Sequence, residues 1–397
     1  MINKISVIGQ GYVGLPLALA ACEAGYSVVG IDNNPIKIKE LQSGKSGIED
    51  VSDSSISKII KSGRYKPTSD YNEISKSNVI LICVPTPLNT NNLPDLTAID
   101  SAANEIARNL TKESLVILES TVKPGTTRDF LVPILEQGSG LSREDFNVAF
   151  SPERIDPLSK KWHIKNTPKI VAGLTEESKI MATDFYSKFI DTVIPVESLE
   201  VAETAKLLEN SFRLVNISFI NEVSIFCQRL GIDINNVINA AATKPYGFMP
   251  FYPSIGVGGH CIPVDPVYLA NKADEIGVET RFIDLAVQIN KEMPGYFVGR
   301  AEEKLGGLKG KKVLVVGVSY KPNIADVRET PVEELIIGLA KRGAEVSWHD
   351  DLVKEWNGKK SVALSNNFDL VILATPHDYL DLKKLGSVPI LNTRSSI

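Results

Sequence analysis

The most constraining feature of the chain is a glycine-rich turn between two predicted strands near the N-terminus. A buried strand is predicted at residues 4–8, and it runs directly into Gly9-Gln-Gly-Tyr-Val-Gly14. An Ala- and Leu-rich helix follows, and a second predicted strand at residues 27–31 ends in Asp32. Glycines at this spacing permit a tight turn and let a pyrophosphate approach the helix N-terminus, while the acid can accept a hydrogen bond from a ribose hydroxyl. This order predicts a dinucleotide-binding Rossmann domain, the alternative being a glycine turn that serves packing alone.

The residues after the second strand indicate which dinucleotide binds. Asp32 is followed by two asparagines and no arginine. A carboxylate here would repel the 2′-phosphate of NADP, so we expect NAD as the cofactor. The expected contacts in this region are Gly9, Gly11, Tyr12, Val13, Gly14 and Asp32.

Strands and helices continue to alternate after this unit. Further strands are predicted at residues 79–84, 115–118, 146–150 and 169–171. Ligands of open parallel sheets lie outside the carboxyl ends of the strands. Thr86, Thr121 and Glu153, which follow three of these strands, are therefore predicted to line one crevice. Helix capping, or a solvated acid, is the alternative for each of them.

One long amphipathic helix of about twenty-five residues or more is predicted from Leu199 onward. Its apolar residues step by three and four: Ala205, Leu208, Phe212, Val215, Phe219, Val223, Phe226 and Leu230. This stripe can form either a homodimer interface or internal core. Lys206 and Asn210 share a face displaced from the stripe, and taken alone they are typical of a solvated surface.

A single thiol stands out in the loop of residues 256–265. The loop places Cys261 between a run of glycines and a proline-restrained segment that ends in a carboxylate. Glycines let the backbone approach a ligand, and prolines keep such a loop from becoming helical. A thiol beside a carboxylate and backbone amides suits nucleophilic attack on a carbonyl, and a small apolar side chain in a turn is the alternative. The other cysteines lie in apolar patterns and are predicted core residues: Cys22, Cys83 and Cys227.

A second alternating unit begins near residue 311. Its first predicted strand lacks the glycine pattern and is followed by Lys321 and Arg328, which are available to anionic groups. The fold expected is therefore α/β, with two Rossmann-like, doubly wound parallel-sheet domains joined by a long central helix. The predicted domains are an NAD-binding domain at 1–198, a central helical domain with the thiol loop at 199–305, and a C-terminal domain at 306–397.

Composition limits the classes of partner. The chain has 397 residues, 43% hydrophobic and 23% charged, with a net charge of −5. This balance is typical of a globular protein and gives no basic footprint for nucleic acid. The N-terminus lacks the layout of a signal peptide, and no apolar run is long enough to span a bilayer, so we expect a cytoplasmic protein with reduced thiols and no membrane partner. The four cysteines show no metal-ligand spacing, and no metal is expected.

In a series of ordered motifs, the chain resembles the UDP-glucose/GDP-mannose dehydrogenases from residue 4 to about 394. The motifs are Gly9-x-Gly11-x-x-Gly14, Val84-Pro-Thr-Pro87, Glu119-Ser-Thr121, Ser151-Pro-Glu153-Arg154, Lys206-x-x-x-Asn210, Gly258-Gly-His-Cys261-Ile-Pro-Val-Asp265, Ser319-Tyr-Lys321-Pro and Arg328-Glu-Thr-Pro331. The resemblance implies a four-electron oxidation of the C6 alcohol of a nucleotide sugar to a carboxylate, with two NAD used in succession. It also implies a thiohemiacetal and then a thioester on Cys261, and a UDP-sugar-binding role for the C-terminal domain.

Roles for further residues come from the same resemblance. Lys206 and Asn210 would stabilise the oxyanion at C6. Thr121, Glu153 and Asp265 would hold or activate the water used in proton transfer and thioester hydrolysis. The expected substrate contacts are Glu153, Arg154, Lys206, Asn210, Phe251, Tyr252, Gly258 and Lys321, and the further expected NAD contacts are Thr86, Thr121 and Arg328.

Two departures from the family pattern narrow the range of expected substrates. Val264 stands where these enzymes usually carry lysine, and Lys244-Pro245 replaces an arginine ahead of the loop. With the segment 243–253 and Ile48-Glu-Asp-Val51, they resemble the branch that acts on UDP-N-acetylhexosamines, especially UDP-N-acetylglucosamine, for surface polysaccharide. The alternatives are UDP-N-acetylgalactosamine, UDP-N-acetylmannosamine or UDP-glucose. The rival classes are a two-electron dehydrogenase of the hydroxy-acid type and an inactive NAD-binding regulatory protein.

Overall fold

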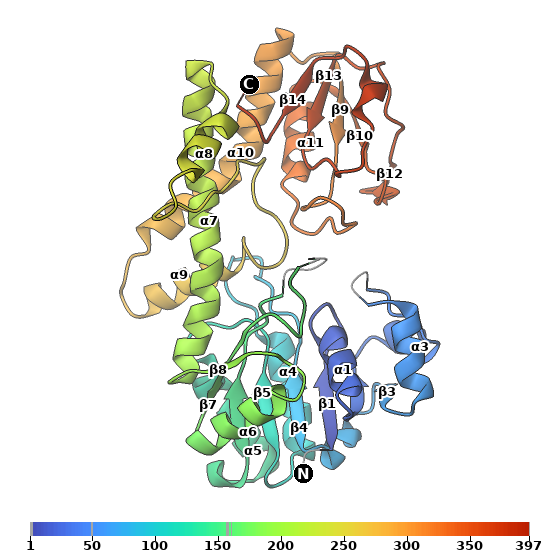
Figure 1. Cartoon of the computed structure of the whole chain (residues 1–397), viewed down its shortest axis with the longest axis vertical. Coiled ribbons are helices and arrows are strands. Elements are labelled where there is room, and N and C mark those ends of the chain that lie inside the picture. Colours follow the sequence, from blue (N-terminus) through green and yellow to red (C-terminus); the bar gives the residue numbers. More distant parts are fainter. Residues whose placement is uncertain (1–2, 49–50, 156–158, 160, 397) are drawn as a thin grey trace. The chain divides into compact units, whose positions relative to one another are not determined.

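The computed structural model describes residues 3–48, 51–155, 159 and 161–396. The chain divides into two compact units, Met1–Leu208 with Val267–Ile276, and Glu209–Pro266 with the residues from Gly277 onward. Each unit contains its own sheet, mainly parallel in the first unit and parallel in the second (Figure 1). Glu49 and Asp50, part of a motif used to narrow the substrate, lie outside the described residues.

The first unit is built on an eight-stranded sheet in the order β3-β2-β1-β4-β5-β6-β7-β8. Neighbouring strands are parallel, except that β6 and β7 pair in antiparallel fashion. The strands are β1 Lys4–Ile8, β2 Ser27–Ile31, β3 Tyr65–Thr68, β4 Val79–Ile82, β5 Leu115–Leu118, β6 Asn147–Phe150, β7 Lys169–Gly173 and β8 Val193–Pro195. All the predicted strands of this half are present.

Helices cover both faces of this sheet, because alternate strand residues point to opposite sides. Val79 and Leu81 enter a core with α1, α3 and α6, whereas Ile80 and Ile82 enter a second core with α4 and α5. The predicted doubly wound α/β fold is confirmed. The helices are α1 Gly14–Glu23, α2 Pro35–Gln42, α3 Asp53–Lys61, α4 Thr97–Asn109, α5 Val132–Ser139 and α6 Glu176–Tyr186, with shorter turns η1 Tyr71–Lys76, η2 Thr127–Leu131 and η3 Arg143–Asp145.

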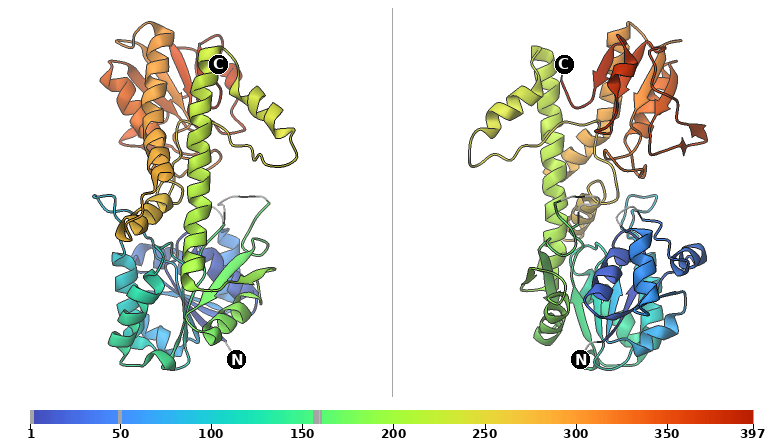
Figure 2. Two further views of the ribbon diagram at one scale, coloured as in Figure 1. Left: turned by 90° about the vertical axis from the view of Figure 1, so that its left-hand side faces the viewer. Right: turned by 45° about the vertical axis from the view of Figure 1, so that its right-hand side comes forward.

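The predicted long helix is α7, Leu199–Leu230, and it has 32 residues. Figure 2 shows it as one continuous helix, followed by the short α8, Ile234–Ala242. Its predicted apolar stripe is largely exposed, since Phe219 and Phe226 are each 61% exposed. Other α7 residues enter the core instead: Ala202, Leu207, Leu214, Ile220 and Cys227. The stripe is therefore a surface of the chain rather than internal core.

The second unit contains a four-stranded parallel sheet in the order β10-β9-β13-β14. Two helices, α10 and α11, pack on one face, and a short turn, η4, with adjoining loops covers the other. The elements are α9 Asp265–Glu275, α10 Arg281–Leu305, β9 Lys312–Val316, α11 Val332–Lys341, β10 Glu345–His349, the hairpin β11 Glu355–Trp356 and β12 Lys359–Lys360, β13 Leu370–Leu373, η4 Leu382–Leu385 and β14 Ile390–Asn392. Pro331 occupies the N-terminal cap position of α11.

The segment after β14 is tied to the beginning of α8. The Ser396 hydroxyl donates to the carbonyl of Ile232 at 2.7 Å and accepts the N–H of Ile234 at 2.8 Å. The Asn235 amide donates to the carbonyl of Arg394 at 2.9 Å. Because Ser396 is buried, these bonds are shielded from water and join the edge of the sheet to the helical part of the unit.

Candidate active site

The turn between β1 and α1 leaves room for a ligand beside its middle glycine only. Gly9 has a φ of +89°, and a Cβ on Gly14 would lie 1.9 Å from its carbonyl oxygen. A Cβ on Gly11 would meet no atom of the described residues within 4 Å. Tyr12 is 40% exposed, and Val13 occupies the cap position of α1. The fold itself thus requires Gly9 and Gly14, whereas Gly11 leaves the approach that a pyrophosphate needs.

Asp32, at the end of β2, holds this turn in place. One carboxylate oxygen accepts the N–H of Gln10 and the other accepts the N–H of Asn34, each at 2.9 Å. Lys37 Nζ lies 3.9 Å from the carboxylate, a neighbour that was not anticipated from the sequence. The Asp32 side chain stays 11% exposed, so it remains open to a ribose hydroxyl. A cavity of about 360 Å³ begins at the following residue and is lined by Asn33, Ser69, Asp70, Tyr71, Asn72, Ser101 and Glu105.

The segments that carry Thr86, Thr121 and Glu153 leave the same edge of the first sheet. They follow β4, β5 and β6, which are adjacent and parallel. The Thr86 carbonyl accepts the hydroxyl of the buried Tyr268 at 3.0 Å. The Glu153 carboxylate accepts a backbone N–H two residues later, and Arg154 donates to a backbone carbonyl at 2.7 Å. A shared ligand crevice at this edge stays a prediction.

Glu119, two residues before Thr121 in the sequence, belongs to a buried cluster of charged and polar side chains. Glu119 is 1% exposed, Lys169 Nζ lies 2.6 Å from its Oε2, and the Tyr186 hydroxyl donates to its Oε1. Burial raises the pKa of Glu119, and the neighbouring ammonium of Lys169 opposes that rise. Sequence reasoning noted Glu119 only as part of a motif and missed both partners, which are 50 and 67 residues away. This cluster fixes the end of β5 from which the Thr121 segment begins.

A second buried carboxylate fixes the rest of that segment to α7. Glu203 accepts the N–H of Gly125 at 2.6 Å and both the N–H and the hydroxyl of Thr127, at 2.9 and 2.6 Å. Burial raises the pKa of Glu203 to about 7, although these hydrogen bonds oppose the rise. Glu203 lies one turn before Lys206 on α7. It therefore fixes the Thr121 segment to the helix that carries Lys206.

Lys206 and Asn210 do not lie on a solvated face. Each is 8% exposed, and they are separated by one turn of α7. The Asn210 amide donates to Oδ2 of Asp265 at 2.5 Å, and Asp265 is 1% exposed. Asn210 and Asp265 belong to the second unit, where two of the predicted catalytic side chains are therefore in direct contact.

Cys261 stands at the start of a helix. Its carbonyl accepts the N–H of Asp265 at 2.8 Å and that of Val264 at 3.1 Å, so the thiol loop turns directly into α9. The unpaired N–H groups and the positive dipole end of a helix favour a thiolate in this position. All four cysteines lie in the described residues, and Cys261 alone is exposed. The exposed thiol agrees with a nucleophile better than with a packing residue.

The residues before the thiol are shaped by close packing. A Cβ on Gly258 would lie 2.4 Å from a backbone oxygen, so glycine is required there even without a ligand. The ring of Phe251 meets that of Phe212 edge to face, with centroids 5.7 Å apart. Tyr252 is 52% exposed and therefore accessible to a ligand.

Lys321 and Arg328 lie in the segment between β9 and α11. The Lys321 side chain is partly buried, and its backbone carbonyl accepts the hydroxyl of Ser319 at 3.1 Å. The Arg328 guanidinium pairs with Asp326, with Nε 2.8 Å from Oδ1. The expected contact of Arg328 with NAD stays a prediction.

Three family models match the chain in succession. They describe the NAD binding domain of the UDP-glucose/GDP-mannose dehydrogenase family at residues 3–190, its central domain at residues 200–292 and its UDP binding domain at residues 314–394. The chain belongs to the UDP-glucose/GDP-mannose dehydrogenase family.

Relatives of this dehydrogenase match over nearly the whole chain. Protein CapL of Staphylococcus aureus is 37% identical over 97% of this chain and 92% of its own length. The UDP-N-acetyl-D-glucosamine 6-dehydrogenase of Salmonella typhi is 37% identical over 98% of this chain and 92% of its own length. Among solved structures, a UDP-D-ManNAc dehydrogenase from Pyrococcus horikoshii matches with a TM-score of 0.91 and 30% identity, covering 99% of this chain and 96% of that one.

The family predicted from the motifs is thus confirmed, and the protein is an NAD-dependent oxidoreductase of the nucleotide-sugar dehydrogenase family. The open approach at Gly11 and the partly exposed Asp32 suit the NAD that its first domain binds. The UDP binding domain coincides with the second sheet. Within the described residues, no helix combines the length and the apolar composition needed to cross a membrane.

Proposed function

We propose that this dehydrogenase oxidises the C6 alcohol of a UDP-N-acetylhexosamine to the uronic acid. The first candidate substrate is UDP-N-acetyl-D-glucosamine. The observation that carries the proposal is the exposed thiol of Cys261 at the start of α9, in the same unit as the bonded pair Asn210 and Asp265. A two-electron alcohol dehydrogenase has no need of such a thiol. A four-electron enzyme needs one, because an aldehyde becomes a good hydride donor only after a nucleophile has added to it.

The chemistry assigns a task to each of these side chains. The C6 alcohol first loses a proton and a hydride, and the thiolate of Cys261 then adds to the aldehyde carbon to form a thiohemiacetal. Loss of a second hydride and proton gives a thioester, which water cleaves to the carboxylate with release of the thiolate. Lys206 and Asn210 stabilise the negative oxygen on C6 in both additions. When bound, each of two successive NAD molecules accepts one hydride.

The remaining side chains hold water and the ligands. Thr121, Glu153 and Asp265 position the water that carries protons and cleaves the thioester. Lys321 anchors the nucleotide sugar from the second sheet, and Arg328 reaches the NAD. Support for these roles comes from the family motifs that these residues occupy and from the UDP binding domain match at residues 314–394.

The substrate assignment rests on relatives with known names. Two are UDP-N-acetyl-D-glucosamine 6-dehydrogenases, 37% and 35% identical to this chain, and others at 33% identity are UDP-N-acetyl-D-mannosamine dehydrogenases. The higher identity favours the glucosamine epimer. The product would then serve as a precursor for surface polysaccharide.

The test is the amount of NADH formed per sugar consumed. UDP-N-acetylglucosamine, its galacto epimer, UDP-N-acetylmannosamine and UDP-glucose would each be supplied in limiting amounts. Two NADH per molecule of UDP-N-acetylglucosamine, and less turnover with the others, is the expected result. One NADH per sugar would exclude the thioester route, and faster turnover of another sugar would overturn the substrate assignment.

The Cys261→Ser variant separates this proposal from its rivals. A hydroxy-acid type enzyme would keep its activity in the variant, because its reaction uses no thiol. The proposed enzyme is expected to lose the second oxidation while still binding UDP and NAD. An inactive regulatory protein would bind these ligands without forming NADH in either the parent chain or the variant.

We also propose that the chain forms a homodimer through α7 and its neighbours. The exposed stripe includes Phe212, Phe219 and Phe226, which recur every seven residues and are 46%, 61% and 61% exposed. Three large aromatic side chains on one helix face are costly to leave in water. A second copy of the same helix offers a matching apolar face.

A further inference from the structure

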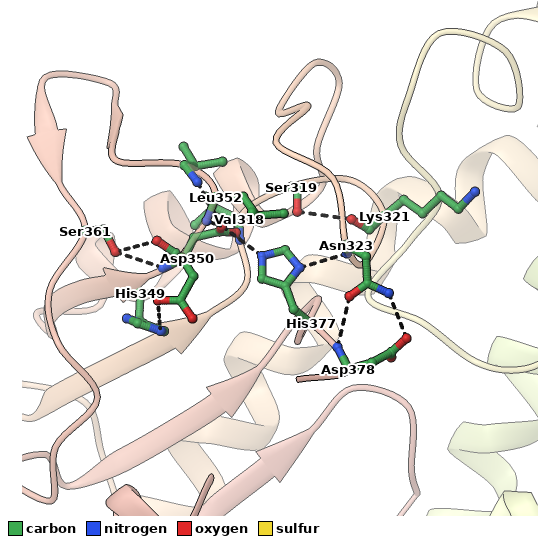
Figure 3. Close-up of polar contacts among 12 residues, drawn as sticks. Val318, Ser319, Lys321, Asn323, His349, Asp350, Leu352, Ser361, His377 and Asp378 are labelled. Atoms are coloured by element: carbon green, nitrogen blue, oxygen red, sulfur yellow. Dashed lines mark hydrogen bonds and ion pairs between the residues drawn. The ribbon is translucent and has the colours of Figure 1, made fainter. Parts of the chain in front are cut away.

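The second sheet repeats the acid that holds the turn in the first. Asp350 directly follows β10, as Asp32 follows β2. Its Oδ2 accepts the N–H of Val318 at 3.0 Å, and its Oδ1 accepts the N–H of Leu352 at 2.9 Å and of Val353 at 3.0 Å (Figure 3). Burial by itself would raise the pKa of Asp350, but these bonds and a histidine lower it to about 2.

The histidine is His377, whose side chain is fully buried between Asp350 and the loop after β9. Its Nε2 lies 2.8 Å from Asp350 Oδ1, and its Nδ1 accepts the N–H of Asn323 at 2.8 Å. Because that N–H is a donor, Nδ1 carries no proton, and the proton of the ring lies on Nε2 and points to the carboxylate. The ring therefore connects the end of β10 to the end of the loop 317–323, because it donates one hydrogen bond to Asp350 and accepts another from Asn323.

Asn323 adds a second connection, to Asp378, which follows His377 in the segment after β13. Its Nδ2 donates to Asp378 Oδ2 at 2.7 Å, and its Oδ1 accepts the N–H of Asp378 at 3.1 Å. Its φ of +66° lies in the left-handed region, which asparagine tolerates better than most residues do. Together with the bond to His377, three hydrogen bonds hold the end of the loop.

The loop held in this way carries two residues that matter for the reaction. Lys321 extends its side chain away from the cluster in Figure 3. Tyr320 lies against the glycines that precede the thiol, since a Cβ on Gly259 would be 2.8 Å from its ring and one on Gly258 would be 2.9 Å from its Cβ. The position of this loop therefore affects both the sugar-anchoring lysine and the support of the Cys261 loop.

We propose that His377 is a positioning residue that holds the loop 317–323, so that Lys321 meets the nucleotide sugar and Tyr320 supports the thiol loop. The inference rests on the proposed function for the identity of the ligand. The residue acts through Asn323 and contacts no reacting atom.

Two amide variants separate the two bonds of the ring. In His377→Asn, the short side chain can keep its oxygen at the place of Nδ1 and so accept the N–H of Asn323, but it does not reach Asp350. In His377→Gln, the longer side chain can donate to Asp350, but it leaves the N–H of Asn323 without its acceptor. The two variants are matched in chemistry and differ in which bond survives.

The experiment measures three quantities on the full chain: the Kd of UDP, the Kd of NAD and the rate of alkylation by iodoacetamide. The other three thiols are buried, so alkylation reports on Cys261. His377→Gln is expected to weaken UDP binding about tenfold and to change the alkylation rate, because a buried donor loses its partner. His377→Asn is expected to stay within about threefold of the parent chain in both quantities. NAD affinity should be unchanged in both variants.

Equal UDP affinity and equal alkylation rates in the parent chain and His377→Gln would overturn the positioning role. Failure of the parent chain to bind UDP would overturn the proposed function instead, and the alkylation rates would then decide the positioning role by themselves. If the histidine variants do not fold, Asn323→Gly replaces them, since it keeps the backbone N–H that His377 accepts and the left-handed φ but removes both bonds to Asp378. UDP binding by Asn323→Gly within about threefold of the parent chain supports the positioning role of His377, and a loss of about tenfold would assign that role to Asp378 instead and overturn the proposal.

Discussion

The amide of Asn210 donates to the carboxylate of Asp265 across 2.5 Å, and both side chains are buried. This bond connects the middle of α7 to the first residue of α9, four positions after Cys261. A carboxylate in this position is oriented by the amide and by its place at the helix N-terminus. Replacing either residue is therefore expected to change the position of the other.

Replacing Asn210 by alanine is expected to lower kcat by about a hundredfold, because it removes the proposed oxyanion donor and the amide that donates to Asp265. Single-turnover measurement of NADH would show which of the two oxidations slows. Asn216→Ala is the control, since Asn216 lies on the same helix and bonds only a backbone carbonyl among the contacts described for it. Equal loss of kcat in the two variants would contradict the prediction.

Two glycines of the turn between β1 and α1 allow the effect of a substitution on NAD binding to be separated from its effect on folding. Gly11→Ala is expected to raise the KM for NAD about tenfold or more without changing the melting temperature, since the added Cβ enters only the space open to a ligand. Gly14→Ala is expected to destabilise the chain, because its Cβ would lie 1.9 Å from the Gly9 carbonyl oxygen. Thermal melting and NAD kinetics on both variants check the pair. A normal KM for NAD in Gly11→Ala would place the cofactor elsewhere.

The raised pKa of Glu203 predicts that the chain becomes less stable as the pH rises. Its pKa is raised from 4.5 to about 7 by burial, so it contributes stability that is full below pH 4.5 and is lost as the pH rises through about 7. Relative to the Glu203→Gln variant, the parent chain should lose about 3 kcal/mol of unfolding free energy over this interval. Denaturant unfolding at pH 5 and pH 8 measures the difference.

The control for that measurement is Glu200→Gln, on the same helix. Hydrogen bonding to Arg128 lowers the pKa of Glu200 to about 2, so its contribution to stability is lost only as the pH falls through that value. Between pH 5 and pH 8 this variant and the parent chain should therefore keep a constant difference. A constant difference for Glu203→Gln as well would show that Glu203 does not titrate in this range.

The exposed aromatic stripe of α7 predicts a change of oligomeric state. Phe219→Glu is expected to convert the proposed dimer into a monomer, because two charges would face each other in an apolar interface. Ile36→Glu is the control, as Ile36 is 68% exposed on α2 in the first unit. Sedimentation equilibrium of the three proteins distinguishes the cases, and a monomeric parent chain would refute the interface.

The strands of the first sheet could be predicted because fully buried parallel strands form short apolar runs, such as Val79–Ile82 and Leu115–Leu118. The strand β3, Tyr65-Lys-Pro-Thr68, was missed because it lies at the edge of the sheet and contains proline. The periodicity of α7 was correctly identified as helical, but periodicity alone does not say whether an apolar stripe faces the core or the solvent. Here the stripe faces outward.

Most of the site residues could be proposed from motifs, since the glycine turn and the thiol loop are local in sequence. The groups that hold them in place could not. Glu203 meets Thr127 across 76 residues, and His377 meets Asn323 across 54. Such pairs form only once the fold brings distant strands and helices together. The spacing of residues along the sequence therefore does not predict them.

The buried state of Asp350 distinguishes the second sheet from the first. Both sheets end their second strand with an aspartate that holds the preceding turn, yet the Asp32 side chain remains 11% exposed while that of Asp350 is fully covered by His377 and backbone amides. The carboxylate of Asp350 is therefore used entirely within the protein, whereas that of Asp32 stays partly accessible to a ligand. The same position of two related sheets thus serves internal structure in one sheet and is left open in the other.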